Sequence, residues 1–254
     1  MSLIDLSGKL ALVTGGSRGI GRATAQLLAR AGARVGITFH SREQDARETL
    51  KLIQAEGSSG WAYQVDLAEE QQILAWFHRV DEEFPDGFDI FVANAGIWPP
   101  EAKPIVDLPT AQWRKTLAVN LDGVYFATRE AGKRLRPSGR IVFVSSTAGQ
   151  RGEAYHADYA ATKGALISMT KGLCVEFANR NITVNSVAPG WVDTEMSEPA
   201  YAEGGLEKIA ASIPLGRVAS AEDIAGPIVF LCSELARHIT GEILNINGGA
   251  VLCG

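Results

Sequence analysis

Short apolar segments alternate along this 254-residue chain with longer amphipathic ones. The apolar segments are β-prone and end in turn residues, a pattern that predicts strands. They comprise residues 10–13, 35–39, 61–65, 90–93, 141–145, 183–187 and 243–246. Most of the intervening segments have the length and periodicity of helices. Because strands that alternate with helices pair in parallel through right-handed crossovers, we predict a doubly wound α/β fold with a seven-stranded parallel sheet.

The chain shows no internal boundary. No proline-rich or glycine-rich linker and no shift in composition divides it, so we expect a single domain over residues 1–254. The pattern weakens only over residues 191–214, where Gly204 and Gly205 lie between flanking prolines. A weakly patterned segment of this length inside a domain is typical of a mobile lid over a substrate site.

Composition and charge exclude several classes of function. With 46% hydrophobic residues the chain can bury a sizeable core, so disorder is not expected. A net charge of -5 without a basic run argues against a nucleic-acid surface. The N-terminal residues lack the pattern of a signal peptide, and no apolar run approaches the ~18 residues of a membrane span. We therefore expect a cytoplasmic protein that binds neither nucleic acid nor membrane.

The cysteines and histidines do not suggest a metal centre. The three cysteines and four histidines are scattered, without a C-x-x-C or H-E-x-x-H spacing. Those spacings are the usual signatures of zinc sites and of redox-active pairs. We expect no metal and no disulfide framework.

A glycine-rich turn follows the first predicted strand. Gly15, Gly19 and Gly21 form a G-x-x-x-G-x-G pattern that leads into a helix and departs from the common G-x-G-x-x-G. In a parallel sheet the first strand-to-helix turn is where a pyrophosphate meets backbone N–H groups. The pattern indicates a dinucleotide site, and a tight turn that binds no ligand is the alternative.

Tyr159 and Lys163 stand four residues apart, which on a helix places both side chains on one face. A nearby ammonium group stabilises a phenolate. A free tyrosine titrates near pH ~10, so acid–base work at neutral pH needs its pKa lowered by about 2 units, or roughly 3 kcal/mol. The plain alternative is a half-buried tyrosine beside a solvated lysine.

Five motifs in order resemble the short-chain dehydrogenase/reductase family. These are T-G-x-x-x-G-I-G after the first strand, Asn94-Ala95-Gly96 after the fourth, Ser146 thirteen residues before the tyrosine, Tyr-x-x-x-Lys, and Pro189-Gly190 after the sixth. The chain is most similar to the 3-oxoacyl-acyl-carrier-protein reductases of that family. The resemblance implies a Rossmann-type domain and an oxidoreductase that interconverts a ketone and a secondary alcohol.

The resemblance also implies a catalytic set of Asn120, Ser146, Tyr159 and Lys163. In this family the tyrosine exchanges the proton, the serine steadies the substrate oxygen, and the lysine lowers the tyrosine pKa and holds the nicotinamide ribose. Ser146 has the family spacing to the tyrosine, whereas strand alternation points Ser145 the other way. Asn120, a poor helix former inside the helix predicted over 113–135, matches the residue that anchors a relay water. An ordinary buried amide is its alternative.

The end of the second strand lacks the acidic residue of NAD-binding relatives. Arg18, His40 and Arg42 can instead neutralise a 2′-phosphate, so NADP(H) is favoured and NAD(H) is the alternative. Ser41 and Asp66 can equally be helix caps. Ala93 stands where the family usually has an asparagine. The remaining cofactor positions implied by the resemblance are Ser17, Ile20, Leu67, Asn94, Ala95, Gly96, Pro189, Gly190, Val192 and Thr194.

The substrate is the least determined part of the prediction. Trp98, Gln150, Tyr155 and Trp191, together with Ser146, are expected to line an apolar, aromatic cavity. The resemblance favours a 3-oxoacyl thioester, with sugar, polyol or other secondary alcohols as alternatives, and a non-catalytic dinucleotide sensor as an alternative of another class. Basic residues at 129–136 can attract an acyl carrier protein. Relatives commonly form homotetramers through the helix that bears Tyr159.

Overall fold

Seven parallel strands form one sheet at the centre of the computed structural model, which describes residues 3–252. The strand order is β3-β2-β1-β4-β5-β6-β7. The chain builds outward from β1 to β3 on one side and then crosses over to add β4 to β7 on the other side of β1. The strands are β1 (Leu10–Val13), β2 (Arg34–Phe39), β3 (Gly60–Gln64), β4 (Phe88–Ala93), β5 (Leu135–Val144), β6 (Thr183–Pro189) and β7 (Ile243–Ile246). All seven predicted strands are therefore confirmed, and the fold is the doubly wound Rossmann type.

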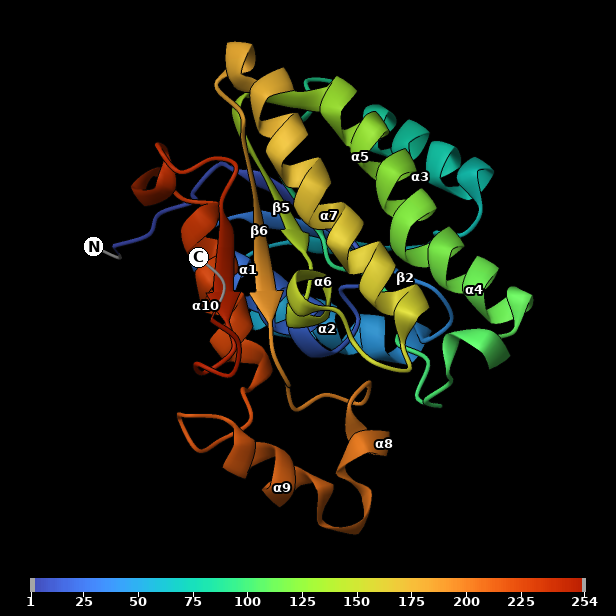
Figure 1. Ribbon diagram of the computed structural model, residues 1–254. Helices are drawn as coiled ribbons and strands as arrows, with labels where there is room; N and C mark the ends of the chain where they lie inside the picture. The colour runs from blue at the N-terminus through green and yellow to red at the C-terminus, as the bar shows by residue number, and fades with distance from the viewer. Residues whose placement is uncertain (1–2, 253–254) are drawn as a thin grey trace.

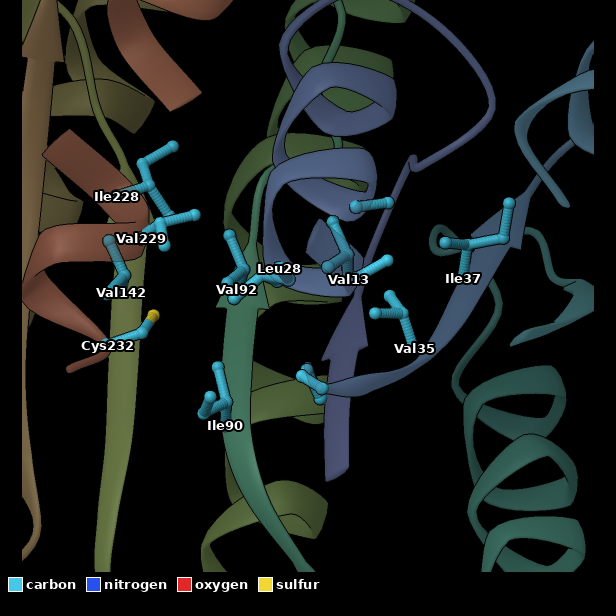
Figure 2. Packing of buried hydrophobic residues seen from close by; sticks show 14 of the residues in the cluster. Val13, Leu28, Val35, Ile37, Ile90, Val92, Val142, Ile228, Val229 and Cys232 are labelled. Carbon is cyan, nitrogen blue, oxygen red and sulfur yellow. The ribbon is translucent and has the colours of Figure 1, made fainter. Parts of the chain in front are cut away.

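Helices cover both faces of the sheet (Figure 1). They are α1 (Gly19–Arg30), α2 (Glu43–Ala55), α3 (Glu70–Glu83), α4 (Thr110–Leu117), α5 (Gly123–Arg134), α6 (Thr147–Arg151), α7 (Ala157–Glu176), α8 (Glu198–Tyr201), α9 (Gly205–Ser212) and α10 (Ala221–Leu231). Because successive side chains of a strand point to opposite faces of the sheet, a separate hydrophobic core lies on each face. In β1, Val13 faces the core of α1 and α10, whereas Leu12 faces that of α3, α5 and α7. Figure 2 shows the first core, with Val13, Val92 and Val142 on neighbouring strands.

The helix predicted over residues 113–135 is present as one helical run from Thr110 to Arg134, but it is not α-helical throughout. It consists of α4 and α5 joined by a π-helical turn, η2 (Ala118–Asp122), and β5 already begins at Leu135. Asn120 lies in the π-helical turn and is fully buried. Such turns widen a helix locally and are frequent at functional sites. Helical periodicity cannot reveal the turn, because the side-chain contacts of Asn120 come from distant segments.

Residues 191–214 lie beyond the carboxyl end of β6 (Figure 1). The segment contains α8, α9 and the short turn η4 (Ala202–Gly204), and it projects from the body of the domain. That placement suits the predicted lid, whose movement stays a prediction. Within residues 3–252, none of the helices combines the length and the apolar character needed to cross a bilayer.

Candidate active site

The glycine-rich turn between β1 and α1 needs its glycines for steric reasons. Gly15 and Gly19 have positive φ angles of 64° and 52°, which side chains other than glycine rarely adopt. A Cβ on Gly21 would collide with the carbonyl oxygen of Gly15. The turn is fastened to β2, because Gly15 N donates to Thr38 Oγ1 at 3.1 Å and Gly16 N donates to the Thr38 carbonyl at 2.9 Å.

The N-terminus of α1 offers a place for an anion. Its first turn reads Gly-Ile-Gly-Arg, so backbone N–H groups and the positive end of the helix dipole point out of the turn without a competing acidic side chain. Arg18 precedes the helix, and Thr194 lies against Gly19 from the segment after β6. These features fit the pyrophosphate of a dinucleotide.

Asn94 ties the glycine turn to the end of β4. Its side-chain amide donates to the carbonyl oxygens of Thr14 and Gly15 at 2.9 and 3.1 Å. Thr14 Oγ1 in turn accepts from the backbone N–H groups of Asn94 and Ala95. Asn94 therefore organises the cofactor turn, and its approach to a ribose stays a prediction. Ala93, in place of the family's usual asparagine, is buried in the core.

The other predicted cofactor residues follow the carboxyl ends of the strands. Gly96 lies beside the Asn120 and Lys163 side chains, because a Cβ there would lie 3.3 Å from Asn120 Oδ1 and 3.4 Å from Lys163 Nζ. Gly190 N donates to the Ile246 carbonyl at 3.0 Å, which fixes the chain as it leaves β6. Ser17 and Ile20 follow β1, Leu67 follows β3, Ala95 follows β4, and Pro189, Val192 and Thr194 belong to the end of β6 or follow it.

Tyr159 and Lys163 lie one turn apart on α7, as their spacing predicts. Lys163 is buried, and its Nζ donates to the Val144 carbonyl at 2.7 Å. The same nitrogen lies 5.7 Å from the centroid of the Tyr159 ring. Burial lowers the pKa of Lys163 to about 8.

The tyrosine pKa differs from the expectation. Burial raises the pKa of Tyr159 to about 12, a hydrogen bond with Ser146 partly opposes that effect, and the carboxylate of Glu153 adds to it. The predicted net lowering of the Tyr159 pKa is therefore wrong for the protein alone. The physical reason is that desolvation of the phenolate outweighs the stabilisation that the Lys163 ammonium group gives from 5.7 Å away. Tyr159 is thus a protonated phenol at neutral pH, the form that a proton donor needs.

The two serines at the end of β5 point in opposite directions. Ser146 caps α6, accepting from Ala148 N at 3.1 Å, and hydrogen-bonds Tyr159. Ser145 Oγ instead donates to the carbonyl oxygen of Lys163 at 2.7 Å. Strand alternation predicted this difference, so Ser146 is the serine beside the phenol.

Asn120 links three parts of the site. Its Oδ1 accepts from Ile97 N, and its Nδ2 donates to the Ile97 carbonyl, both at 2.8 Å. Nδ2 also reaches Thr162 Oγ1 on α7 at 3.4 Å. The amide thus holds the loop after β4 against the catalytic helix, and its part in a water relay stays a prediction.

The structure contradicts the alternative reading of Ser41 and Asp66 as helix caps. Helix α2 begins at Glu43 with Arg42 in the N-cap position, so Ser41 lies one residue outside it. Helix α3 begins at Glu70 after Glu69, so Asp66 does not cap it. Asp66 Oδ1 accepts from Ala68 N at 2.9 Å, and its Oδ2 lies 3.4 Å from His40 Nε2. Asp66 therefore shapes the turn after β3 and pairs with His40.

A carboxylate does stand at the expected phosphate position, contrary to the sequence-based expectation. Glu195 Oε2 lies 2.6 Å from Arg18 Nη1 and 2.9 Å from Arg42 Nη1. It comes from the segment after β6 rather than from the end of β2. Sequence reasoning missed it because 177 residues separate Glu195 from Arg18 and no motif marks it.

The expected substrate residues come together only in part. The Trp98 ring stacks on His156 with centroids 4.8 Å apart and meets Trp191 edge-on at 6.1 Å. Gln150 instead binds Asn245 Oδ1 at 2.5 Å, and Tyr155 is 58% exposed with a φ of 67°.

Sequence reasoning missed two further aromatic or polar members of this cluster. Tyr201 packs on Trp191 with ring centroids 6.3 Å apart, and its hydroxyl donates to the Val192 carbonyl. His156 is buried, and within residues 3–252 its Nε2 has no hydrogen-bond partner. The periodicity of the sequence does not reveal either residue, because Tyr201 ends the short helix α8 and His156 is the N-cap residue of α7, and both reach the cluster only through tertiary packing.

The fold and the site together define a dinucleotide-binding α/β oxidoreductase. The family model described as enoyl-(acyl carrier protein) reductase matches residues 15–251. A relative from Aquifex aeolicus, named 3-oxoacyl-[acyl-carrier-protein] reductase FabG, is 40% identical and covers 97% of this chain and 98% of its own. The chain belongs to the short-chain dehydrogenase/reductase family.

Solved structures agree with that assignment. A short chain dehydrogenase from Burkholderia cenocepacia, crystallised in complex with NADP, has a TM-score of 0.90 and 39% identity, covering 96% of this chain and 98% of its own. A blue fluorescent protein from a metagenomic library, in complex with NADPH, has a TM-score of 0.90 and 33% identity, covering 98% of this chain and all (100%) of its own.

Proposed function

We propose that this protein is an NADP(H)-dependent oxidoreductase that reduces a ketone to a secondary alcohol. The observation that carries the proposal is the contact of the Tyr159 phenol with Ser146 and buried Lys163, next to a glycine turn suited to a pyrophosphate. Relatives solved with NADP and NADPH support the choice of cofactor. NAD(H) remains the alternative that a direct comparison tests.

The residues divide the chemistry among themselves. The bound nicotinamide supplies the hydride. Tyr159 donates its proton to the substrate oxygen, which Ser146 holds by its hydroxyl. Lys163 supplies positive charge beside the phenol and stabilises the phenolate that remains after the proton has left. Asn120 keeps the loop after β4 and helix α7 in register, so that these groups keep their spacing.

The favoured substrate is a 3-oxoacyl thioester, because the Aquifex aeolicus relative is named a 3-oxoacyl-[acyl-carrier-protein] reductase. The aromatic cluster of Trp98, Trp191 and Tyr201 offers an apolar wall for an acyl group. An acyl carrier protein is the proposed carrier.

The basic residues 129–136 do not support docking of such a carrier by charge. Arg129, Lys133 and Arg134 pair with Glu130, and Arg136 pairs with Asp89. Arg129 and Arg134 bind Glu70 and Asp81 as well. The positive charge at this helix end is therefore balanced within the chain.

The proposed enzyme is a cytoplasmic homotetramer. Helix α7 turns Leu166 into the core, whereas Ala161 and Gly172 are exposed and Val175 is 73% exposed. Tyr125 of α5 is exposed on the same layer of helices, where the helical run made of α4, η2 and α5 lies beside α7 (Figure 1). Small and apolar exposed residues on adjacent helices suit close packing against a second copy.

The proposed function is tested by following cofactor oxidation with a 3-oxoacyl thioester, a diketone and a ketose, each with NADPH and with NADH. We expect turnover with NADPH, fastest on the thioester. Preference for NADH would contradict the cofactor assignment. Tight NADPH binding without turnover on any of these carbonyls would favour a dinucleotide sensor.

A further inference from the structure

The carboxylate of Glu195 occupies the position between two guanidinium groups where a phosphate would bind. One oxygen atom, Oε2, meets Arg18 Nη1 at 2.6 Å and Arg42 Nη1 at 2.9 Å. Both arginines lie beside the glycine turn and the end of β2, which is where the adenosine ribose lies in dinucleotide sites of this fold. An oxyanion held by two arginines is the arrangement that also binds a phosphate.

The chain holds Glu195 in this position by its backbone. Val192 is buried and bridges to Ala219, and Asp193 N donates to the Ala219 carbonyl at 2.8 Å. Thr194 packs against Gly19, and its carbonyl accepts from Ser197 N at 2.9 Å. These contacts join the start of the 191–214 segment to the glycine turn and to Ala219, and they bring the Glu195 carboxylate to the two arginines.

The charges favour replacement of Glu195 by a phosphate. Arg18 and Arg42 carry two positive charges against the single negative charge of Glu195, while Asp45 is shared between Arg42 and Arg22 at 3.5 and 3.6 Å. A phosphomonoester carries about −1.5 to −2 charges at pH 7 and three acceptor oxygens. It can satisfy both guanidinium groups better than one carboxylate oxygen, but it must first displace that carboxylate.

We propose that Glu195 is a specificity-determining residue that competes with the cofactor 2′-phosphate for Arg18 and Arg42. This inference rests on the proposed function. Displacing Glu195 weakens NADP(H) binding, whereas NAD(H) has only a 2′-hydroxyl there and leaves the two ion pairs in place. The preference for NADP(H) over NAD(H) is therefore smaller with Glu195 present than Arg18 and Arg42 alone would give.

The test uses adenosine 2′,5′-bisphosphate and adenosine 5′-monophosphate, which differ only in the 2′-phosphate. Their dissociation constants are measured by calorimetry with the full chain and with Glu195→Gln. We expect Glu195→Gln to tighten binding of the bisphosphate about fivefold, the size expected for removing exposed ion pairs, and to leave the monophosphate unchanged. Glu198→Gln, an equal charge change on an exposed residue three positions along, should alter neither constant.

A second pair of variants tests whether the effect of Glu195 on bisphosphate binding depends on Arg42. In Arg42→Gln the bisphosphate should bind more weakly, and adding Glu195→Gln to that variant should recover much less than fivefold. An unchanged bisphosphate constant in Glu195→Gln would overturn the inference. So would weaker monophosphate binding, since that would show Glu195 accepting from the 2′-hydroxyl.

Failure of the proposed function has a different result. If NADP(H) were not the cofactor, the wild-type chain would bind the bisphosphate no better than the monophosphate, and Arg42→Gln would not weaken it. If wild type preferred the bisphosphate and Glu195→Gln bound it with an unchanged dissociation constant, only the competition between Glu195 and the 2′-phosphate would be overturned.

Discussion

At the residue scale, burial is the largest influence on the pKa of both proposed catalytic groups, Tyr159 and Lys163. Burial raises the pKa of Tyr159 to about 12 and lowers the pKa of Lys163 to about 8. The first keeps a proton on the phenol for delivery to a ketone. The second means that the positive charge beside the phenol is present below about pH 8 and is lost above it, because a lysine is charged only when protonated.

We therefore expect ketone reduction to slow as the pH rises through about 8. The pH profile of kcat/KM for the cofactor, which reports groups of the free enzyme, is the measurement. Lys163→Met should remove this alkaline limb together with most of the activity. A wild-type profile that stays flat to pH ~10, where an unperturbed lysine titrates, would contradict the assignment.

The glycine turn gives a second residue-scale prediction. In Gly21→Ala the new methyl group would collide with the Gly15 carbonyl and lie 2.6 Å from Asn94 Nδ2. We expect NADPH binding, measured by fluorescence titration, to weaken by about tenfold or more, since displacement of the turn costs over 1.4 kcal/mol. Gly172→Ala is the control, because a Cβ there meets nothing within 4 Å. Equal affinity in Gly21→Ala and wild type would refute the steric argument.

The sequence predicted the mutual positions of Ser146, Tyr159 and Lys163 better than the surroundings of Arg18 and Arg42. Ser146, Tyr159 and Lys163 follow from local spacing, because one strand end and one helix fix their mutual positions. Glu195 and His156 have no such spacing. Their contacts depend on how irregular segments pack, and a sequence contains that information only in the whole fold.

At the element scale, hydrophobic runs predicted the sheet because its central strands, such as β1, β4 and β6, are buried between two helix layers. Parallel strands of this kind are apolar on both faces and end abruptly at turn residues. Helix boundaries were predicted less well. The Asn120 contacts with Ile97 accompany a π-helical turn inside the predicted 113–135 helix, and Arg42 rather than Ser41 takes the N-cap of α2.

Glu130 forms ion pairs with three basic side chains of its own helix, α5. It is buried, and burial alone would raise its pKa, but hydrogen bonds from Lys133, Arg134 and Arg129 outweigh that effect and lower the pKa to about 2. A carboxylate with a lowered pKa contributes stability above its unfolded pKa. That contribution is lost as the pH falls from about 4.5 towards about 2.

We expect Glu130→Gln to lower the free energy of unfolding by about 1.5 kcal/mol at pH 7, because the buried Glu130 side chain loses its ion pairs with Arg129, Lys133 and Arg134. The loss stays moderate because Lys133 is solvated, while Arg129 and Arg134 keep Glu70 and Asp81 as partners. Urea unfolding measures the change, and the difference from wild type should shrink as the pH approaches 2. Glu70→Gln removes an exposed partner of Arg129 and should cost less than about 1 kcal/mol. Equal stability of Glu130→Gln and wild type at pH 7 would contradict this account.

At the scale of the whole molecule, the proposed ligand-binding groups gather at the carboxyl end of the strands, and the exposed face of α7 is the one proposed for assembly. Val175 is 73% exposed on that helix. In Val175→Glu we expect the particle mass from light scattering to fall from four chains towards two or one, because the interface would have to bury a charge. A wild-type protein that is monomeric at micromolar concentration would contradict the proposed tetramer.

The central claim is that Tyr159 donates the proton during NADPH-dependent ketone reduction. The most direct test compares wild type with Tyr159→Phe, measuring NADPH affinity by fluorescence and turnover with a 3-oxoacyl thioester. We predict unchanged affinity and a fall in kcat of about 10²- to 10⁴-fold, the usual contribution of a positioned acid. Turnover near the wild-type rate in Tyr159→Phe would contradict the account.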